Sequence, residues 1–141
     1  MSVTFQAGVL DPKSDYPKPI WTCKCNGYCD ACYNHEPNLA NSNARDVLSW
    51  LDLEDEYLCG RLKATEFRAR CKRRLWDEPR NHDPGMTADE VAHHLGLEPS
   101  CRVITQARAP GYIRAQITRL LKIAEEAIEE AGEEETYISW G

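Results

Sequence analysis

Four cysteines lie within ten residues near the amino-terminal end of the chain, with the spacing C-x-C-x3-C-x2-C. Four thiolates from so short a segment can surround one tetrahedral zinc ion. The C-x-C half is less usual in zinc ribbons, so a nearby histidine could replace one of its two cysteines. A catalytic zinc keeps one position open for water, whereas four or five candidate ligands predict a closed, structural site. The candidate ligands are Cys23, Cys25, Cys29, Cys32 and His35.

An iron–sulfur cluster is the main chemical alternative to zinc, because sets of four cysteines also hold such clusters. The cysteine spacing matches none of the common ferredoxin patterns, however. The chain has seven cysteines, and an odd number is unusual in a secreted disulfide framework. The first residues show neither the basic segment nor the long apolar segment of a signal peptide. These observations predict a reducing, cytoplasmic location in which the cysteine cluster binds a metal.

Charge is strongly segregated along the chain, whose net charge is -6. Residues 61–80 carry eight basic and three acidic side chains, whereas residues 125–135 hold seven glutamates. A concentrated, arginine-rich block suits contacts with nucleic-acid phosphates. A solvated helix face, or neutralisation by the glutamates near the carboxy terminus, explains the same block without a ligand. The nucleic-acid hypothesis assigns contacts in this block to Arg68, Arg70, Arg73 and Arg74.

Two helices are expected in the centre of the chain. Asn43 can cap a helix that Gly60 ends, and apolar periodicity predicts a second helix over about 64–76. The connection over 59–62 is short enough to make the two helices antiparallel. The sequence therefore predicts a helical hairpin across residues 43–78.

Residues 44–76 resemble the SHOCT (short C-terminal) helical-hairpin modules, which commonly read Gly-x-Ile/Leu-Thr/Ser-x-x-Glu-Phe at their turn. The matching positions are Gly60, Leu62, Glu66 and Phe67. The resemblance implies a compact hairpin that is used for association or for flanking other domains. It implies no catalytic residue.

A capping box from Thr87 to Glu90 predicts a helix through Leu95, with Gly96 as its C-cap. Residues 87–108 resemble the helix-turn-helix of repressor families, which implies that the second helix contacts DNA. The implied contacts are Arg102, Gln106 and Arg108. The β-branched run over 103–105 suits a strand instead, and the Ala-Pro-Gly that follows Arg108 stops any helix early.

The last helix is expected over about 112–131, with a continuous apolar stripe that makes it either a core helix or a homodimer surface. Gly132 ends it, and residues 136–140 are expected to form a strand beside residues 3–10. The predicted fold is mainly α: a metal-binding region over 1–42, the central hairpin, and a helix-turn-helix with its long helix over 86–141. These parts are expected to form one compact unit.

Three functional hypotheses follow. The first is a small, non-enzymatic, zinc-stabilised protein that binds double-stranded DNA or modulates transcription. The second is an adaptor that binds a partner protein through its acidic carboxy-terminal helix. The third is a metal-dependent nuclease, because residues 81–84 resemble the core of an HNH nuclease, with His82 as the essential residue.

Two further expectations concern the setting of the protein. No stretch approaches the roughly 18 apolar residues that span a bilayer, so no membrane association is expected. Eleven arginines against six lysines suggest a GC-rich source such as an actinobacterium or its phage. A phage-encoded chain would work in the host cytoplasm.

Overall fold

The computed structural model describes residues 2–10, 13–21, 29, 34–53, 56–77, 83–96 and 107–141. Within these residues the fold combines four helices with a five-stranded sheet. In chain order the elements are β1 (Ser2–Leu10), β2 (Pro17–Pro19), β3 (Asn38–Ala40), α2 (Asn41–Trp50), β4 (Gly60–Lys63), α3 (Ala64–Asp77), α4 (Ala88–His94), α5 (Tyr112–Ala131) and β5 (Thr136–Trp140).

The sheet is built around β1, which has neighbours on both edges. Its strand order is β2-β1-β5-β4, with β3 also paired to β1, and every pairing is antiparallel. Alternate residues Val3, Phe5 and Ala7 are buried on one face, and Ile138 and Trp140 of β5 lie on the same face. This period of two gives the sheet one apolar side. The predicted pairing of residues 136–140 with residues 3–10 is confirmed.

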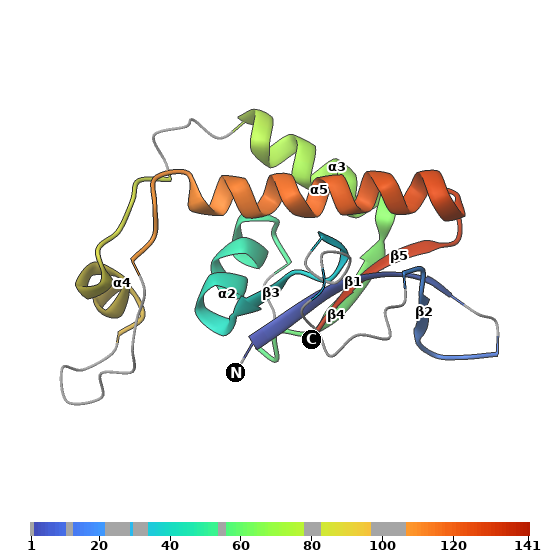
Figure 1. The fold of residues 1–141 in the computed structure, drawn as a ribbon, viewed down its shortest axis with the longest axis horizontal. Helices are drawn as coiled ribbons and strands as arrows, with labels where there is room; N and C mark the ends of the chain where they lie inside the picture. The colour runs from blue at the N-terminus through green and yellow to red at the C-terminus, as the bar shows by residue number, and fades with distance from the viewer. Residues whose placement is uncertain are drawn as a thin grey trace.

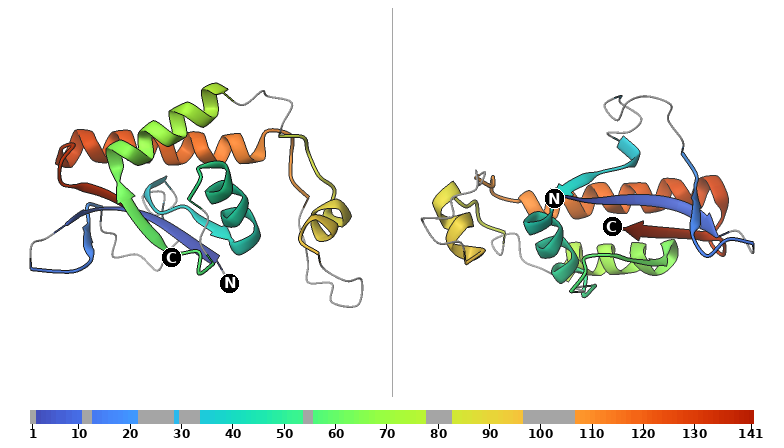
Figure 2. Two further views of the ribbon diagram at one scale, coloured as in Figure 1. Left: turned by 180° about the vertical axis from the view of Figure 1, so that it is seen from behind. Right: turned by 90° about the horizontal axis from the view of Figure 1, so that it is seen from below.

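Helices α3 and α5 cover the apolar face of the sheet and pack against each other (Figure 1). In the view from below in Figure 2, β1 runs along α5, and β5 is seen between α5 and α3. Phe67 and Cys71 of α3 are fully buried, as are Ile117 and Ala124 of α5. At these positions the apolar stripe of α5 is therefore part of the core, as the core-helix interpretation expected.

The predicted mainly α fold was wrong, because the chain is a mixed α/β protein. The error concerns short strands whose partners are distant in sequence. Residues 60–63, expected to turn between two helices, form β4 and pair with β5 near the carboxy terminus. Helices α2 and α3 are consequently joined through a strand rather than by a tight turn, and α2 ends at Trp50. Local patterns do not show such long-range pairing.

An arm, described over residues 83–96 and 107–110, carries α4 away from the sheet (Figure 1). The predicted capping box is present: the Thr87 hydroxyl accepts from the backbone N–H of Glu90, whose side chain accepts from the N–H of Thr87. Gly96 follows with a φ of 68°, a conformation that favours glycine. Arg108 lies in an antiparallel bridge with Met86, not at the end of a recognition helix. Arg102 and Gln106 lie outside the described residues.

Cys71 provides a test of the core. Its burial raises the pKa of the thiol from 9.0 to about 12, whereas Cys59 is exposed. Because the thiolate is the nucleophile, we expect iodoacetamide at about pH 8 to label Cys59 and to spare Cys71 until the protein unfolds. Mass spectrometry of the labelled peptides checks this expectation; equal labelling of both thiols in the folded protein would contradict it.

The folded state also disfavours ionisation of the Cys71 thiol. The contribution of the neutral thiol to stability is therefore full below pH 9 and is lost as the pH rises toward about 12.

Candidate functional site

The basic helix α3 uses several of its arginines to hold the end of α2. Arg70 donates from Nη1 to the carbonyl oxygens of Leu51 (3.1 Å) and Asp52 (3.0 Å). Arg74 donates from Nε to the carbonyl oxygen of Trp50. These carbonyls lie at the carboxy-terminal end of α2, where helical partners are missing and cationic donors are favoured. Both predicted nucleic-acid contacts therefore have structural roles.

Two other cations of α3 face glutamates from the carboxy-terminal part of the chain. Arg68 Nη2 lies 3.9 Å from Glu133 Oε1, and Lys72 Nζ lies 3.3 Å from Glu125 Oε1. These pairs are largely exposed, so each contributes little to stability. They nevertheless neutralise part of the basic block, as the alternative interpretation of the sequence expects. Arg73 is exposed and has no ion-pair partner within the described part of the chain.

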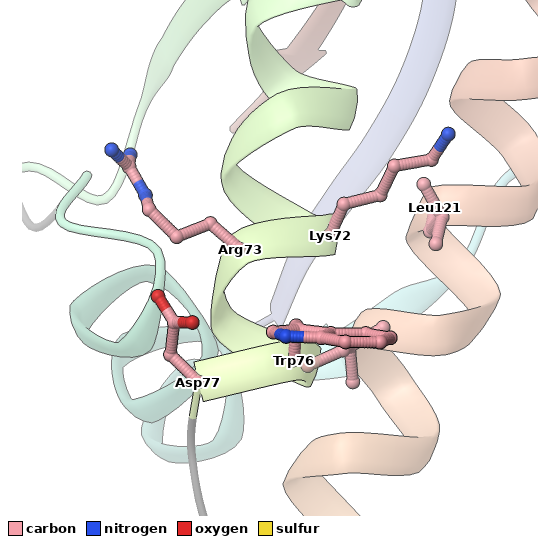
Figure 3. A pocket seen from close by; sticks show the side chains of 6 residues that line it. Lys72, Arg73, Trp76, Asp77 and Leu121 are labelled. Carbon is pink, nitrogen blue, oxygen red and sulfur yellow. The ribbon is translucent and has the colours of Figure 1, made fainter.

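The end of α3 forms one side of an apolar hollow of about 490 Å³. Trp76 is 89% exposed there, the largest exposure among the large apolar side chains of the described residues. In Figure 3, Lys72 extends above the Trp76 ring toward Leu121 of α5, while Arg73 and Asp77 point to the opposite side of α3. We call this surface the Trp76 platform; its lining residues are Lys72, Arg73, Leu75, Trp76, Asp77 and Leu121.

Sequence reasoning did not single out Trp76 as a candidate contact residue, although a signal was present. The apolar stripe of α3 runs through Phe67, Cys71 and Leu75, which are three or four positions apart. Trp76 lies about 100° around the helix from Leu75. An indole outside the apolar stripe, among basic neighbours, indicates a contact surface rather than core packing.

His35, the one predicted metal-ligating histidine, occupies a defined position. Its ring stacks on Trp21 with 4.1 Å between ring centroids and an angle of 15°. Its Nε2 atom lies 3.5 Å from Glu126 Oε2. Its Nδ1 atom is buried and has no hydrogen-bond partner among the described residues. The Glu126 carboxylate thus faces Nε2, while Nδ1 has a lone pair or a proton that no described residue uses.

The remaining predicted ligands are placed only in part. Cys29 is half-buried, whereas Cys23, Cys25 and Cys32 lie outside the described residues. The described residues alone contain no group of three or more His, Cys, Asp or Glu side chains arranged to hold a metal. His82, assigned to the nuclease hypothesis, also lies outside them. No helix in the described ranges is long and apolar enough to cross a membrane.

Arg108, expected at a DNA interface, points into the protein. Its side chain is 6% exposed and lies between α2 and the arm. Nε donates to Asn43 Oδ1 over 2.9 Å, and Nη1 donates to the carboxylate of Asp46. His94 Nε2 lies 3.3 Å from the same carboxylate. Asp46 of α2 thus contacts both described parts of the arm, through His94 and Arg108.

Comparison with protein-family models, with curated proteins and with solved structures gave no match.

Proposed function

We propose that the protein is a zinc-stabilised nucleic-acid-binding protein and that the Trp76 platform is its contact surface. The observation that carries this proposal is the 89% exposure of Trp76 at the end of a basic helix. A single-stranded nucleic acid is the expected ligand, because stacking on an indole requires an unpaired base. This differs from the double-stranded DNA that the helix-turn-helix resemblance implies.

The chemistry of the platform fits this ligand. An exposed aromatic ring offers about 1–3 kcal/mol per stacked base, and it accepts any base because every base has a π-face. Lys72 extends beside the ring, whereas Arg73 points to the opposite side of α3 (Figure 3). Lys72 can therefore contact a phosphate next to a stacked nucleotide, and Arg73 can contact a phosphate farther along a strand that crosses the end of the helix. Arg73 has no ion-pair partner among the described residues. Its guanidinium can therefore contact a phosphate without first losing an ion pair to any of them.

Replacing Trp76 by alanine tests this proposal. We expect Trp76→Ala to weaken binding of a labelled single-stranded oligonucleotide by about tenfold, from the loss of one stacking contact, as measured by fluorescence anisotropy. Trp76→Phe should retain most of the affinity because it keeps an aromatic face. Arg73→Ala should weaken binding and lower its salt dependence by about one phosphate contact.

A matched control removes another exposed aromatic ring. Tyr16 is 78% exposed and precedes β2 in the chain, so Tyr16→Ala deletes an exposed ring outside the platform. The variant is expected to bind like the unaltered protein. Equal affinity of Trp76→Ala and Tyr16→Ala for the oligonucleotide would overturn the assignment of the platform.

Zinc at the cysteine cluster is the second part of the proposal, and His35 supports it. Metal-ligating histidines usually have their other ring nitrogen held by a carboxylate or carbonyl, and here the carboxylate of Glu126 faces Nε2 at 3.5 Å. The buried Nδ1 without a partner is then the nitrogen that would bind the metal. The stack of Trp21 on His35 brings together the two ends of the segment that holds all four cysteines. Zinc would fix the geometry of this segment without catalysing a reaction.

A further inference from the structure

Three residues of α3 lie in a line that begins at the Trp76 platform. Arg68, Lys72 and Trp76 are four positions apart, so they share one face of the helix, with successive members about 6 Å apart along its axis. This face borders α5, which packs against α3. Exposure rises along the line, from 30% of the Arg68 side chain to 58% of the Lys72 side chain and 89% of Trp76. A ligand on the platform can therefore extend along the line.

Two glutamates face the cations of this line. Lys72 Nζ lies 3.3 Å from Glu125 Oε1, and Arg68 Nη2 lies 3.9 Å from Glu133 Oε1. The side chains of Glu125 and Glu133 are 46% and 67% exposed, so both ion pairs are open to solvent. A carboxylate presents to a cation the same kind of anionic oxygen that a phosphate presents. Exposed pairs of this kind are weak, so a phosphate can displace the carboxylate.

We propose that a single strand runs from the Trp76 platform over Lys72 and Arg68, and that its phosphates replace the two glutamates. This inference rests on the proposed function of the platform. One base stacks on Trp76, the adjacent phosphate contacts Lys72, and a phosphate farther along the strand contacts Arg68. In the unbound protein Glu125 and Glu133 hold the places of these phosphates. The two glutamates thus compete with the strand and lower its affinity.

Removing the two competing charges tests this path of the strand. We expect Glu125→Gln with Glu133→Gln to bind a labelled single-stranded oligonucleotide about fivefold more tightly than the unaltered protein, measured by fluorescence anisotropy. The matched control, Glu129→Gln with Glu130→Gln, makes the same change in net charge. Both control glutamates are exposed on α5, and neither has an ion-pair partner among the described residues. The control should gain less than about twofold, because it frees no cation.

The cations of the line provide a second test. Arg68→Gln with Lys72→Gln should weaken binding, and should lower the slope of log affinity against log salt by about 1.4, because each contact with a single strand contributes about 0.7. In this background the substitutions of Glu125 and Glu133 should gain no more than the control substitutions. The reason is that no cation remains for them to free.

Three results would overturn the proposal. If neither the unaltered protein nor the glutamine variants bind the oligonucleotide, the proposed function fails together with this path. If the unaltered protein binds, but Glu125→Gln with Glu133→Gln gains no more than the control, the path alone is wrong. The path is also wrong if the full gain persists after Arg68 and Lys72 are replaced.

Discussion

Asp46→Ala is expected to lower the free energy of unfolding by about 3 kcal/mol, because it leaves the guanidinium of Arg108 buried without its anionic partner. Arg108 is 6% exposed, so water cannot replace the lost carboxylate easily. Local opening of the arm should also become more frequent, because it brings the unpaired Arg108 into water and because Asp46 contacts both Arg108 and His94. Urea denaturation followed by circular dichroism gives the stability change, and amide exchange in α4 reports the local opening.

Two controls separate this ion pair from a general effect of losing an aspartate. Asp77 is exposed at the end of α3, and Asp77→Ala should change the stability by less than about 0.5 kcal/mol. Replacing both partners by apolar residues, Asp46→Leu with Arg108→Met, should recover much of the loss because no buried charge remains. A double variant less stable than Asp46→Ala would show that the pair itself, and not the uncompensated charge, provides the stability.

Removing the proposed zinc is expected to have the other large effect. A structural zinc contributes its binding free energy to folding, so a chelator should destabilise the protein by several kcal/mol and disturb the Trp21–His35 stack. Purified protein should contain one zinc per chain and be colourless. Metal analysis with an absorbance spectrum checks this, and a visible chromophore would identify an iron–sulfur cluster instead.

Single substitutions test which residues would hold the proposed zinc. Cys29→Ser and His35→Ala should each lower the zinc content after dialysis against a chelator, while Cys59→Ser, at an exposed cysteine beyond the cluster, should not. Glu126→Gln should weaken zinc binding less than His35→Ala, because Glu126 acts only on the orientation of the histidine. Stoichiometric zinc retained by His35→Ala at all chelator concentrations would remove His35 from the site.

The helices with strong local signals could be predicted from the sequence. The apolar period of α5 and its terminating Gly132 gave a helix over 112–131, which is the observed Tyr112–Ala131. The Thr87 and Glu90 capping box located the start of α4. Both signals involve residues that are close in sequence, so they can be recognised without knowledge of the tertiary contacts.

The sheet could be predicted only in part, because its pairings are long-range. The pairing of β1 with β5 was anticipated from apolar strands at the two ends of the chain, but β4 was not. Gly60 carries a turn-like signal and sits instead against Trp140, where a Cβ atom would lie 2.7 Å from the indole. The glycine is needed there for close approach, a requirement that only the folded chain reveals.

Long-range contacts also limited what could be predicted of the candidate site. Arginine-rich composition indicated a nucleic-acid surface, yet Arg70 and Arg74 contact α2, and Arg108 pairs with a residue 62 positions away. The sequence could not distinguish these internal arginines from Arg73. Exposure made the distinction, and it also identified Trp76, which the sequence had placed only at a helix end.

The most direct test of the Trp76 platform compares one labelled oligonucleotide in two forms, single-stranded and annealed to its complement. Stacking on Trp76 predicts that the unaltered protein binds the single strand about tenfold more tightly, and that Trp76→Ala loses this preference. Equal or tighter binding of the duplex by the unaltered protein would contradict the proposed mode of recognition.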